Sequence, residues 1–247
     1  MYYYLTYLSP CFIFTLSPHT HVYKMKEFIS HRFTEFKQVS LLTLLSVFLL
    51  ALRMKITHDF FLLFLIWNLF LAFIPYLMVV RLRFRESVST TNIILTGIVW
   101  LAFLPNAPYI ITDLIHVRHA SSEWMVYEVL MLASFALTGL YLGFLSLRDM
   151  SAVLQQKGWI TTSKYRSLFE YTILALCGYG IYLGRVLRWN SWDIIQRPEK
   201  LFYDMGNLFI HPFSNQRAWL LIISMSLFLI VIFSLFKNNT SVTKTAP

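Results

Sequence analysis

Residues 101–116, LAFLPNAPYIITDLIH, decide how this chain folds, because a long apolar run ends there in two prolines. Pro105 and Pro108 lack the backbone donors that a continuous helix needs. Asp113 and His116 follow these prolines, at the end of the apolar run. Polar and ionisable side chains at the edge of the hydrocarbon are costly and therefore indicate a function. We predict a membrane span that breaks at the prolines and holds a polar site beside the break.

The composition is that of a membrane protein. Hydrophobic residues make up 57% of the 247 positions and charged residues 13%, whereas a soluble domain has about 45–50% and about 25%. Apolar runs of the roughly 20 residues that cross a bilayer occur near 36–55, 60–80, 92–112, 124–147, 167–187 and 218–236. The sequence therefore predicts an all-α polytopic membrane bundle of about six transmembrane helices. Its third span is broken by proline and is followed by a short helix at the outer interface.

Lysine and arginine residues predict the orientation of these spans. With both termini in the cytoplasm, the more basic loops, including Arg81, Arg83 and Arg85, fall on the cytoplasmic side, as basic residues prefer. The net charge of +9 is then a topology signal. Because the basic loops are short, it predicts the lipid bilayer and not a nucleic acid as partner. The first span is short, and Arg53 and Lys55 are expected to extend their side chains to the membrane surface.

The two ends of the chain are expected to lie outside the membrane domain. Residues 1–24 are rich in tyrosine and lack the basic start of a secretory signal, while Met25 begins an ordinary cytoplasmic sequence. We expect an N-terminal extension at 1–24 that is loosely ordered or precedes the true start, one membrane domain at 25–236, and a polar tail at 237–247. The two cysteines support neither a disulfide nor a metal site.

Two glycine pairs mark close helix packing. Gly139 and Gly143 form one small-xxx-small pair, and Gly180 and Gly184 form another. Such pairs let helix backbones approach closely, either inside a bundle or at a homodimer face, and the oligomeric state is left open. In the predicted topology the first pair lies toward the inner side and the second toward the outer side. The two pairs are therefore not expected to meet at one depth.

The residues after the break predict a short polar-faced helix. Asn106 is suited to cap a helix over about 107–117. On that helix Tyr109, Asp113 and His116 share one narrow face, opposite the apolar residues. Periodicity leaves open whether the segment completes the crossing or lies in the interface.

A second polar cluster follows the fifth span. Arg185, Arg188 and Trp192 are expected to share a helical face there. An even number of crossings separates the outer ends of the third and fifth spans, so both clusters are expected on the outer side. Either arginine can then pair with Asp113 or Asp193, or bind an anionic lipid head group. The candidate binding residues are Asn106, Tyr109, Arg185, Arg188, Asn190, Trp192 and Asp193.

Asp113 and His116 are the candidate catalytic residues, with three interpretations open. His116 can act as a general base that Asp113 orients, the two can bind a metal with further ligands, or both can belong to a structural hydrogen-bond network. Because this spacing is frequent by chance, no metal site is predicted. Glu128 is expected to join the cluster. No nucleophile elbow or phosphate-binding glycine loop identifies a cofactor, which stays unknown.

Three strings resemble a known family: WNLFLAFIPY at 67–76, LPNAPYIITDLIH at 104–116 and LGRVLRWNSWD at 183–193. They look like the characteristic blocks of the membrane family named domain of unknown function 1361, over most of the chain from about Met25. The resemblance implies a bacterial cytoplasmic-membrane protein with no settled activity. The motif positions that it carries over are Asn68, Pro75, Asn106, Pro108, Tyr109, Thr112, Asp113, His116, Arg185, Arg188, Asn190, Trp192 and Asp193.

Function is left between two classes. One is a membrane-embedded enzyme that acts on a phosphate-bearing lipid or envelope substrate, with arginines holding the phosphate. The other is a permease or an accessory subunit of a membrane complex. The permease is disfavoured because the broken helix is expected at a membrane boundary, whereas transport sites usually lie at mid-membrane.

Overall fold

The computed structural model describes residues 18–85, 88–119 and 123–242, and this part of the chain contains helices and no strand. The predicted all-α class is confirmed. The elements are α1 (Pro18–Thr57), η1 (Phe61–Leu63), α2 (Phe64–Phe84), α3 (Thr90–Phe103), α4 (Asn106–Tyr109), η2 (Ile110–His119), α5 (Met125–Gln156), α6 (Ser163–Arg185), α7 (Asp193–Gln196), α8 (Pro198–Ile210) and α9 (Gln216–Val242).

Internal contacts divide the chain into two compact units, Met1–Phe36 and Lys37–Pro247. In the first unit Arg32 and Glu35 form an ion pair of 2.6 Å one turn apart on α1. Residues 1–17 of the predicted N-terminal extension and residues 243–247 of the predicted tail lie outside the described residues. The candidate site belongs entirely to the second unit.

Five described helical segments are long and apolar enough to cross a membrane: Arg32–Thr57, Phe61–Phe84, Thr90–Arg118, Met125–Gln156 and Gln216–Lys237. They confirm five of the six predicted spans. The span predicted at 167–187 is present as the 23-residue helix α6, but it is not among these five. Helix α6 is less apolar than these five segments because it contains glycine, tyrosine and the buried Glu170 besides leucine and isoleucine.

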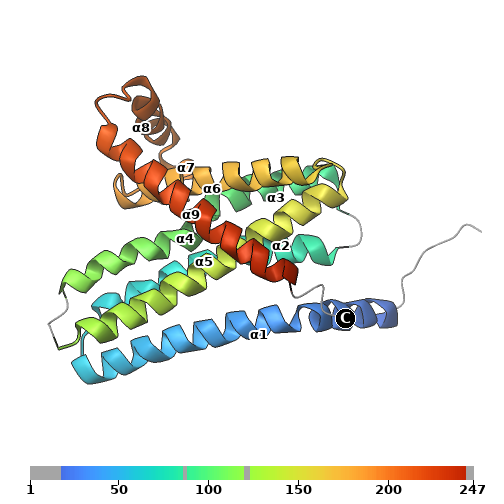
Figure 1. Cartoon of the computed structure of the whole chain (residues 1–247), viewed down its shortest axis with the longest axis horizontal. Helices are drawn as coiled ribbons and strands as arrows, with labels where there is room; N and C mark the ends of the chain where they lie inside the picture. The colour runs from blue at the N-terminus through green and yellow to red at the C-terminus, as the bar shows by residue number, and fades with distance from the viewer. Residues whose placement is uncertain (1–17, 86–87, 120–122, 243–247) are drawn as a thin grey trace, which may run out of the picture. The chain divides into compact units, whose positions relative to one another are not determined.

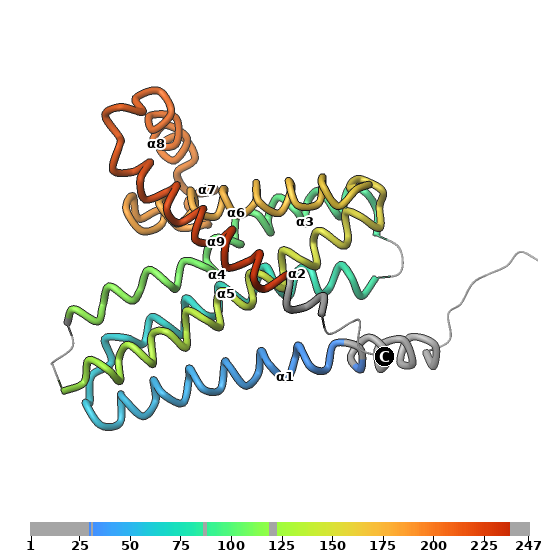
Figure 2. Tube along the Cα trace, viewed as in Figure 1, coloured from blue at the N-terminus to red at the C-terminus, as the bar shows by residue number. Residues whose placement is uncertain are grey.

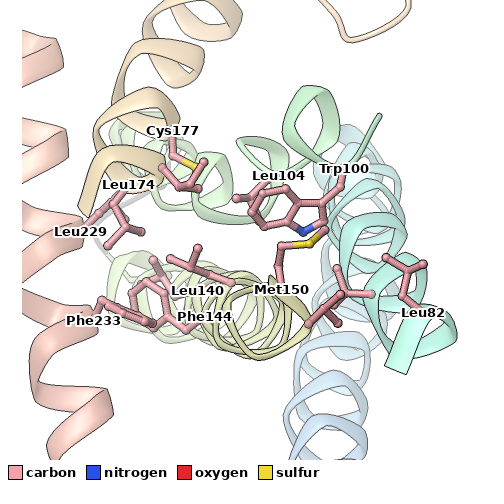
Figure 3. Packing of buried hydrophobic residues seen from close by; sticks show 14 of the residues in the cluster. Leu82, Trp100, Leu104, Leu140, Phe144, Met150, Leu174, Cys177, Leu229 and Phe233 are labelled. Atoms are coloured by element: carbon pink, nitrogen blue, oxygen red, sulfur yellow. The ribbon is translucent and has the colours of Figure 1, made fainter. Parts of the chain in front are cut away.

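Helix α5 is the centre of the second unit, and 72% of its most apolar window is buried. Figure 3 shows Leu140 and Phe144 of α5 packed among Leu174 of α6 and Leu229 and Phe233 of α9. On its other side α5 packs along α2, and α4 and η2 also contact it (Figure 1). The core is thus built around one central helix.

A buried polar link joins three of these helices. The Trp100 indole N–H of α3 donates to the Ser146 hydroxyl of α5 at 2.8 Å. That hydroxyl donates to the Pro75 carbonyl of α2 at 3.0 Å. Buried polar groups need such partners, so this chain of hydrogen bonds fixes the register of α2, α3 and α5.

Arg53 does not extend to the membrane surface as predicted. Its side chain is 8% exposed, and it donates to Glu128 of α5 at 3.0 Å and to Asp59 at 2.9 Å. Glu128 accordingly pairs with α1 and not with the predicted polar cluster, which corrects that expectation as well. The buried carboxylate of Glu128 and the half-exposed carboxylate of Asp59 together satisfy the guanidinium donors, so Arg53 remains within the bundle.

The two glycine pairs meet on the same segment, which corrects the prediction that they lie at different depths. A Cβ added at Gly139 would lie 2.3 Å from the Ala107 carbonyl oxygen, and one at Gly180 would lie 2.6 Å from the Pro105 ring. Gly143 likewise faces Ala107 and Gly184 faces Tyr109. Helices α5 and α6 therefore hold Pro105 and α4 between them through four glycines, and the predicted role in bundle packing is confirmed.

Candidate functional site

The proline break lies inside a candidate span and not at its end. Thr90–Arg118 forms one candidate span of 29 residues, and the chain continues from α3 through α4 into η2 (Figure 2). Leu104 and Pro105 keep helical backbone angles, so the break is a kink. Pro105 removes one donor, while the Tyr109 N–H still reaches the Pro105 carbonyl at 3.0 Å.

Asn106 does not cap a helix, because the residue before it is already helical and no side-chain cap bond forms. Its amide nitrogen donates instead to the Phe103 carbonyl at 2.9 Å and to the Ser191 hydroxyl at 3.1 Å. Ser191 in turn donates to the Ala102 carbonyl at 3.0 Å. Asn106 thus joins the kink to the segment that follows α6.

Asp113 is the buried centre of the site, with 1% of its surface exposed. It lies on η2, which the sequence predicted as an α-helix and which has three residues per turn. Its Oδ1 accepts from Arg185 of α6 at 2.9 Å, and its Oδ2 accepts from the Asn68 amide of α2 at 2.8 Å. Arg185 also donates to the Tyr109 hydroxyl at 3.4 Å. Three helices that are distant in sequence therefore meet at one carboxylate.

His116 lies one turn beyond Asp113 on η2. Its ring packs edge-on against Phe61 and Phe64, with centroids 5.6 and 5.2 Å away. In the described part of the chain no three His, Cys, Asp or Glu side chains are grouped so that they can hold a metal ion. The arrangement favours a packing role for His116 over a metal-binding one.

Helix α6 ends at Arg185, so Arg188 and Trp192 do not continue its face as predicted. Arg188 has a left-handed φ of 60°, and the Trp189 N–H then reaches back to the Leu183 carbonyl at 3.0 Å. Left-handed residues commonly terminate helices in this way. Arg188 is exposed and forms no hydrogen bond or ion pair with the described residues. Of the two candidate arginines, only Arg185 pairs with Asp113.

Asp193 forms a separate polar group at the start of α7. Its carboxylate accepts from the Asn190 backbone N–H at 2.7 Å and from Arg197 at 3.1 Å. These partners, the backbone N–H first, hold the pKa of Asp193 below its usual value despite burial. Trp192 packs on Trp67 of α2, with ring centroids 6.5 Å apart. This group therefore orders the segment after α6. Asp193 pairs with Arg197, and Arg185 pairs with Asp113.

A partly open cavity of about 450 Å³ lies beside these groups. Helices α2, α3, α4, α6 and α8 and the segment 189–194 supply its walls. Most of the lining is apolar, and the polar lining side chains include Asn68, Asn106, Asn190 and Ser191. The described lining residues do not include Asp113, His116 or Arg185. Asn68 and Tyr109 line the cavity and also contact the ion pair, so they connect the two.

Helix α8 is the part of the site that the sequence reasoning missed. Its Leu201 and Met205, one turn apart, line the cavity. The Trp189 indole N–H donates to Asp204 at 3.1 Å, and the Tyr179 hydroxyl donates to the Met205 carbonyl at 3.4 Å. Pro198 in the first turn and the apolar spacing of 201, 205 and 208 are the signals that predict such a helix.

The family model described as "Protein of unknown function (DUF1361)" matches residues 67–232. The chain belongs to this family. The match covers every described residue that lines the cavity, from Trp67 to Met205. It confirms the family resemblance of the three quoted strings. No curated protein and no solved structure matches the chain.

Proposed function

We propose that this DUF1361 protein binds one amphiphilic molecule from the bilayer in the cavity beside the kink, in a bacterial cytoplasmic membrane. The observation that carries the proposal is the cavity itself. Its volume of about 450 Å³ falls within the roughly 300–1,000 Å³ of ligand pockets, which are mainly apolar with a few placed polar groups. The lining has this composition.

The surroundings of the cavity support entry from the lipid side. Trp67, Ile98, Leu176 and Ile194 line the cavity and are all exposed on the described bundle. Trp67 and Ile98 belong to candidate membrane spans, where exposed apolar side chains are expected to face hydrocarbon. A lipid can then enter sideways without crossing a polar surface.

The geometry favours binding over proton transfer at Asp113. Both carboxylate oxygens accept hydrogen bonds, from Arg185 and from Asn68, and the side chain is almost completely buried. A group held in this way stabilises the arrangement of helices around the cavity. An enzyme that modifies a lipid also begins by binding an amphiphile, so binding is the function that the site supports best.

Filling the cavity tests the proposal. Ala102 lines it, and we expect Ala102→Phe to abolish retention of the amphiphile because the ring occupies its space. The full chain is purified in nanodiscs of bacterial polar lipid, and native mass spectrometry counts the molecules it retains. Wild type and Ala51→Phe, a change at an exposed position of α1, are expected to keep one molecule.

Two results would contradict the proposal. Wild-type protein that retains no molecule has no binding site of this kind. Equal retention by Ala102→Phe and wild type would place any bound lipid elsewhere. The thermal unfolding midpoint of each variant shows whether it remains folded.

We further propose that both termini are cytoplasmic, which requires α6 to cross the membrane as the sixth span. One additional cysteine, either at Lys157 between α5 and α6 or at Lys200 in α8, tests this arrangement. A membrane-impermeant maleimide is expected to label the Lys200→Cys variant in intact cells and the Lys157→Cys variant only after lysis. Wild type controls for Cys11 and Cys177, and labelling of both positions from one side would disprove the arrangement.

A further inference from the structure

The cavity carries no charge of its own. Among the described residues that line it, none has a formally charged side chain. Arg185 lies next to it through Tyr109, but its guanidinium is paired with Asp113 at 2.9 Å. A phosphate or carboxylate head group bound here would be desolvated without a counter-charge, which is unfavourable. The lining therefore selects against anionic head groups.

Three amides of the lining have fixed orientations. The Asn68 amide nitrogen donates to the Asp113 carboxylate, and the Asn106 amide nitrogen donates to the Phe103 carbonyl. A carboxylate paired with arginine and a backbone carbonyl only accept hydrogen bonds, so each must face the amide nitrogen. Asn190 is oriented in the same way toward Asp193.

These orientations leave three acceptors for a ligand. The Oδ1 atoms of Asn68, Asn106 and Asn190 have no hydrogen-bond partner in the part of the chain that the structure describes. All three residues line the cavity. An amide oxygen binds a donor and repels another acceptor, so it matches a hydroxyl and not a phosphate oxygen.

Aromatic rings complete the lining. Trp67, Tyr109, Tyr179 and Trp189 all border the cavity. The polar atoms of Tyr179 and Trp189 are bound to Met205 and Asp204, which fixes both rings in place. Aromatic faces carry partial negative charge, and they attract the C–H faces of a sugar ring, which carry partial positive charge.

We propose that the bound amphiphile has an uncharged head group with several hydroxyls, as in a sugar-bearing lipid. This inference rests on the proposed function. The three amide oxygens accept from the hydroxyls and the aromatic rings lie against the C–H faces of the sugar. Apolar lining residues such as Leu101, Leu176 and Leu183 hold the lipid chain.

Amphiphiles with one chain and different head groups test the inference. The full chain in amphipol is titrated with decyl maltoside, decyl phosphate and decyl dimethylamine oxide, each below its micelle concentration, and with maltose. Binding is measured by the shift in thermal unfolding midpoint and by native mass spectrometry. We expect decyl maltoside to bind at least about tenfold more tightly than decyl phosphate, a ratio that two lost hydrogen bonds account for.

A matched pair of variants assigns this preference to the amide oxygens. Asn190→Ala removes one acceptor, while the backbone N–H that binds Asp193 remains. We expect it to reduce the affinity for decyl maltoside about fivefold, the effect of one hydrogen bond. Asn207→Ala, at an exposed position of α8 outside the cavity lining, is expected to leave that affinity unchanged.

The outcomes separate this inference from the proposed function. Equal binding of the three decyl compounds, or tightest binding of decyl phosphate, would overturn the head-group assignment and leave amphiphile binding intact. Maltose bound as tightly as decyl maltoside would overturn the assignment to a lipid. If Ala102→Phe binds decyl maltoside as wild type does, the cavity is not the site, and the proposed function fails together with the inference.

Discussion

Gly139→Ala and Gly180→Ala are each expected to destabilise the protein by about 1–3 kcal/mol, the usual cost of overpacking a tightly packed core. The new methyl group would lie 2.3 Å from the Ala107 carbonyl oxygen in the first variant and 2.6 Å from the Pro105 ring in the second. A backbone carbonyl and a proline ring cannot rotate away as the end of a flexible side chain can. To make room for the methyl group, either the segment at residues 105–109 or the helix that carries the substitution must shift.

Thermal unfolding of the purified chain in detergent measures this effect, and abundance in the membrane gives a second readout. Gly97→Ala is the matched control, since a Cβ at Gly97 has no atom within 4 Å. Alanine is the better helix former, by up to about 1 kcal/mol, so this control is expected to be neutral or slightly stabilising. If all three variants unfold at the wild-type temperature, the glycines of α5 and α6 do not pack closely against Pro105 and α4.

Arg185→Met is expected to cost about 3 kcal/mol, because it leaves the buried Asp113 carboxylate without its positive partner. The lower end of the range for broken buried pairs applies, since the Arg185 side chain is 23% exposed while that of Asp113 is 1% exposed. The Asn68 amide alone then faces the charge. Denaturant or thermal unfolding in detergent measures the loss.

Arg188→Met is the control for this change, because Arg188 is exposed and has no ion pair with the described residues. It is expected to alter stability by less than about 0.5 kcal/mol. Adding Asp113→Leu to Arg185→Met removes the uncompensated charge, so the double variant is expected to be more stable than Arg185→Met alone. Equal losses from Arg185→Met and Arg188→Met would show that the ion pair does not stabilise the bundle.

Much of the fold was predictable because it depends on local composition. Five of the predicted spans are present as long apolar helices, and hydropathy alone locates such segments. The approach of Arg185 to Asp113 was predicted as one option among several pairings. The sequence could not choose Arg185 over Arg188, because the choice depends on the left-handed turn at Arg188 that ends α6.

Other features depended on contacts between distant segments and so escaped prediction. Arg53 was expected at the surface because the first span is short, yet Glu128, 75 positions further along the chain, lies beside it in the fold. Asn106 was expected as a helix cap, the local role that asparagine prefers. Its amide nitrogen instead donates a hydrogen bond to the hydroxyl of Ser191, 85 positions further along the chain.

Apolar length and missing backbone donors act locally, so the amino-acid sequence alone identifies this chain as a helical membrane protein with a span broken at Pro105. The role of this break in the bundle depends on contacts between helices that are distant in sequence. Four glycines from two helices converge on Pro105 and α4, and the cavity forms where the kink leaves space beside α6 and α8. Shape complementarity between helices arises from side chains that are far apart in sequence, so periodicity does not encode it in a readable form.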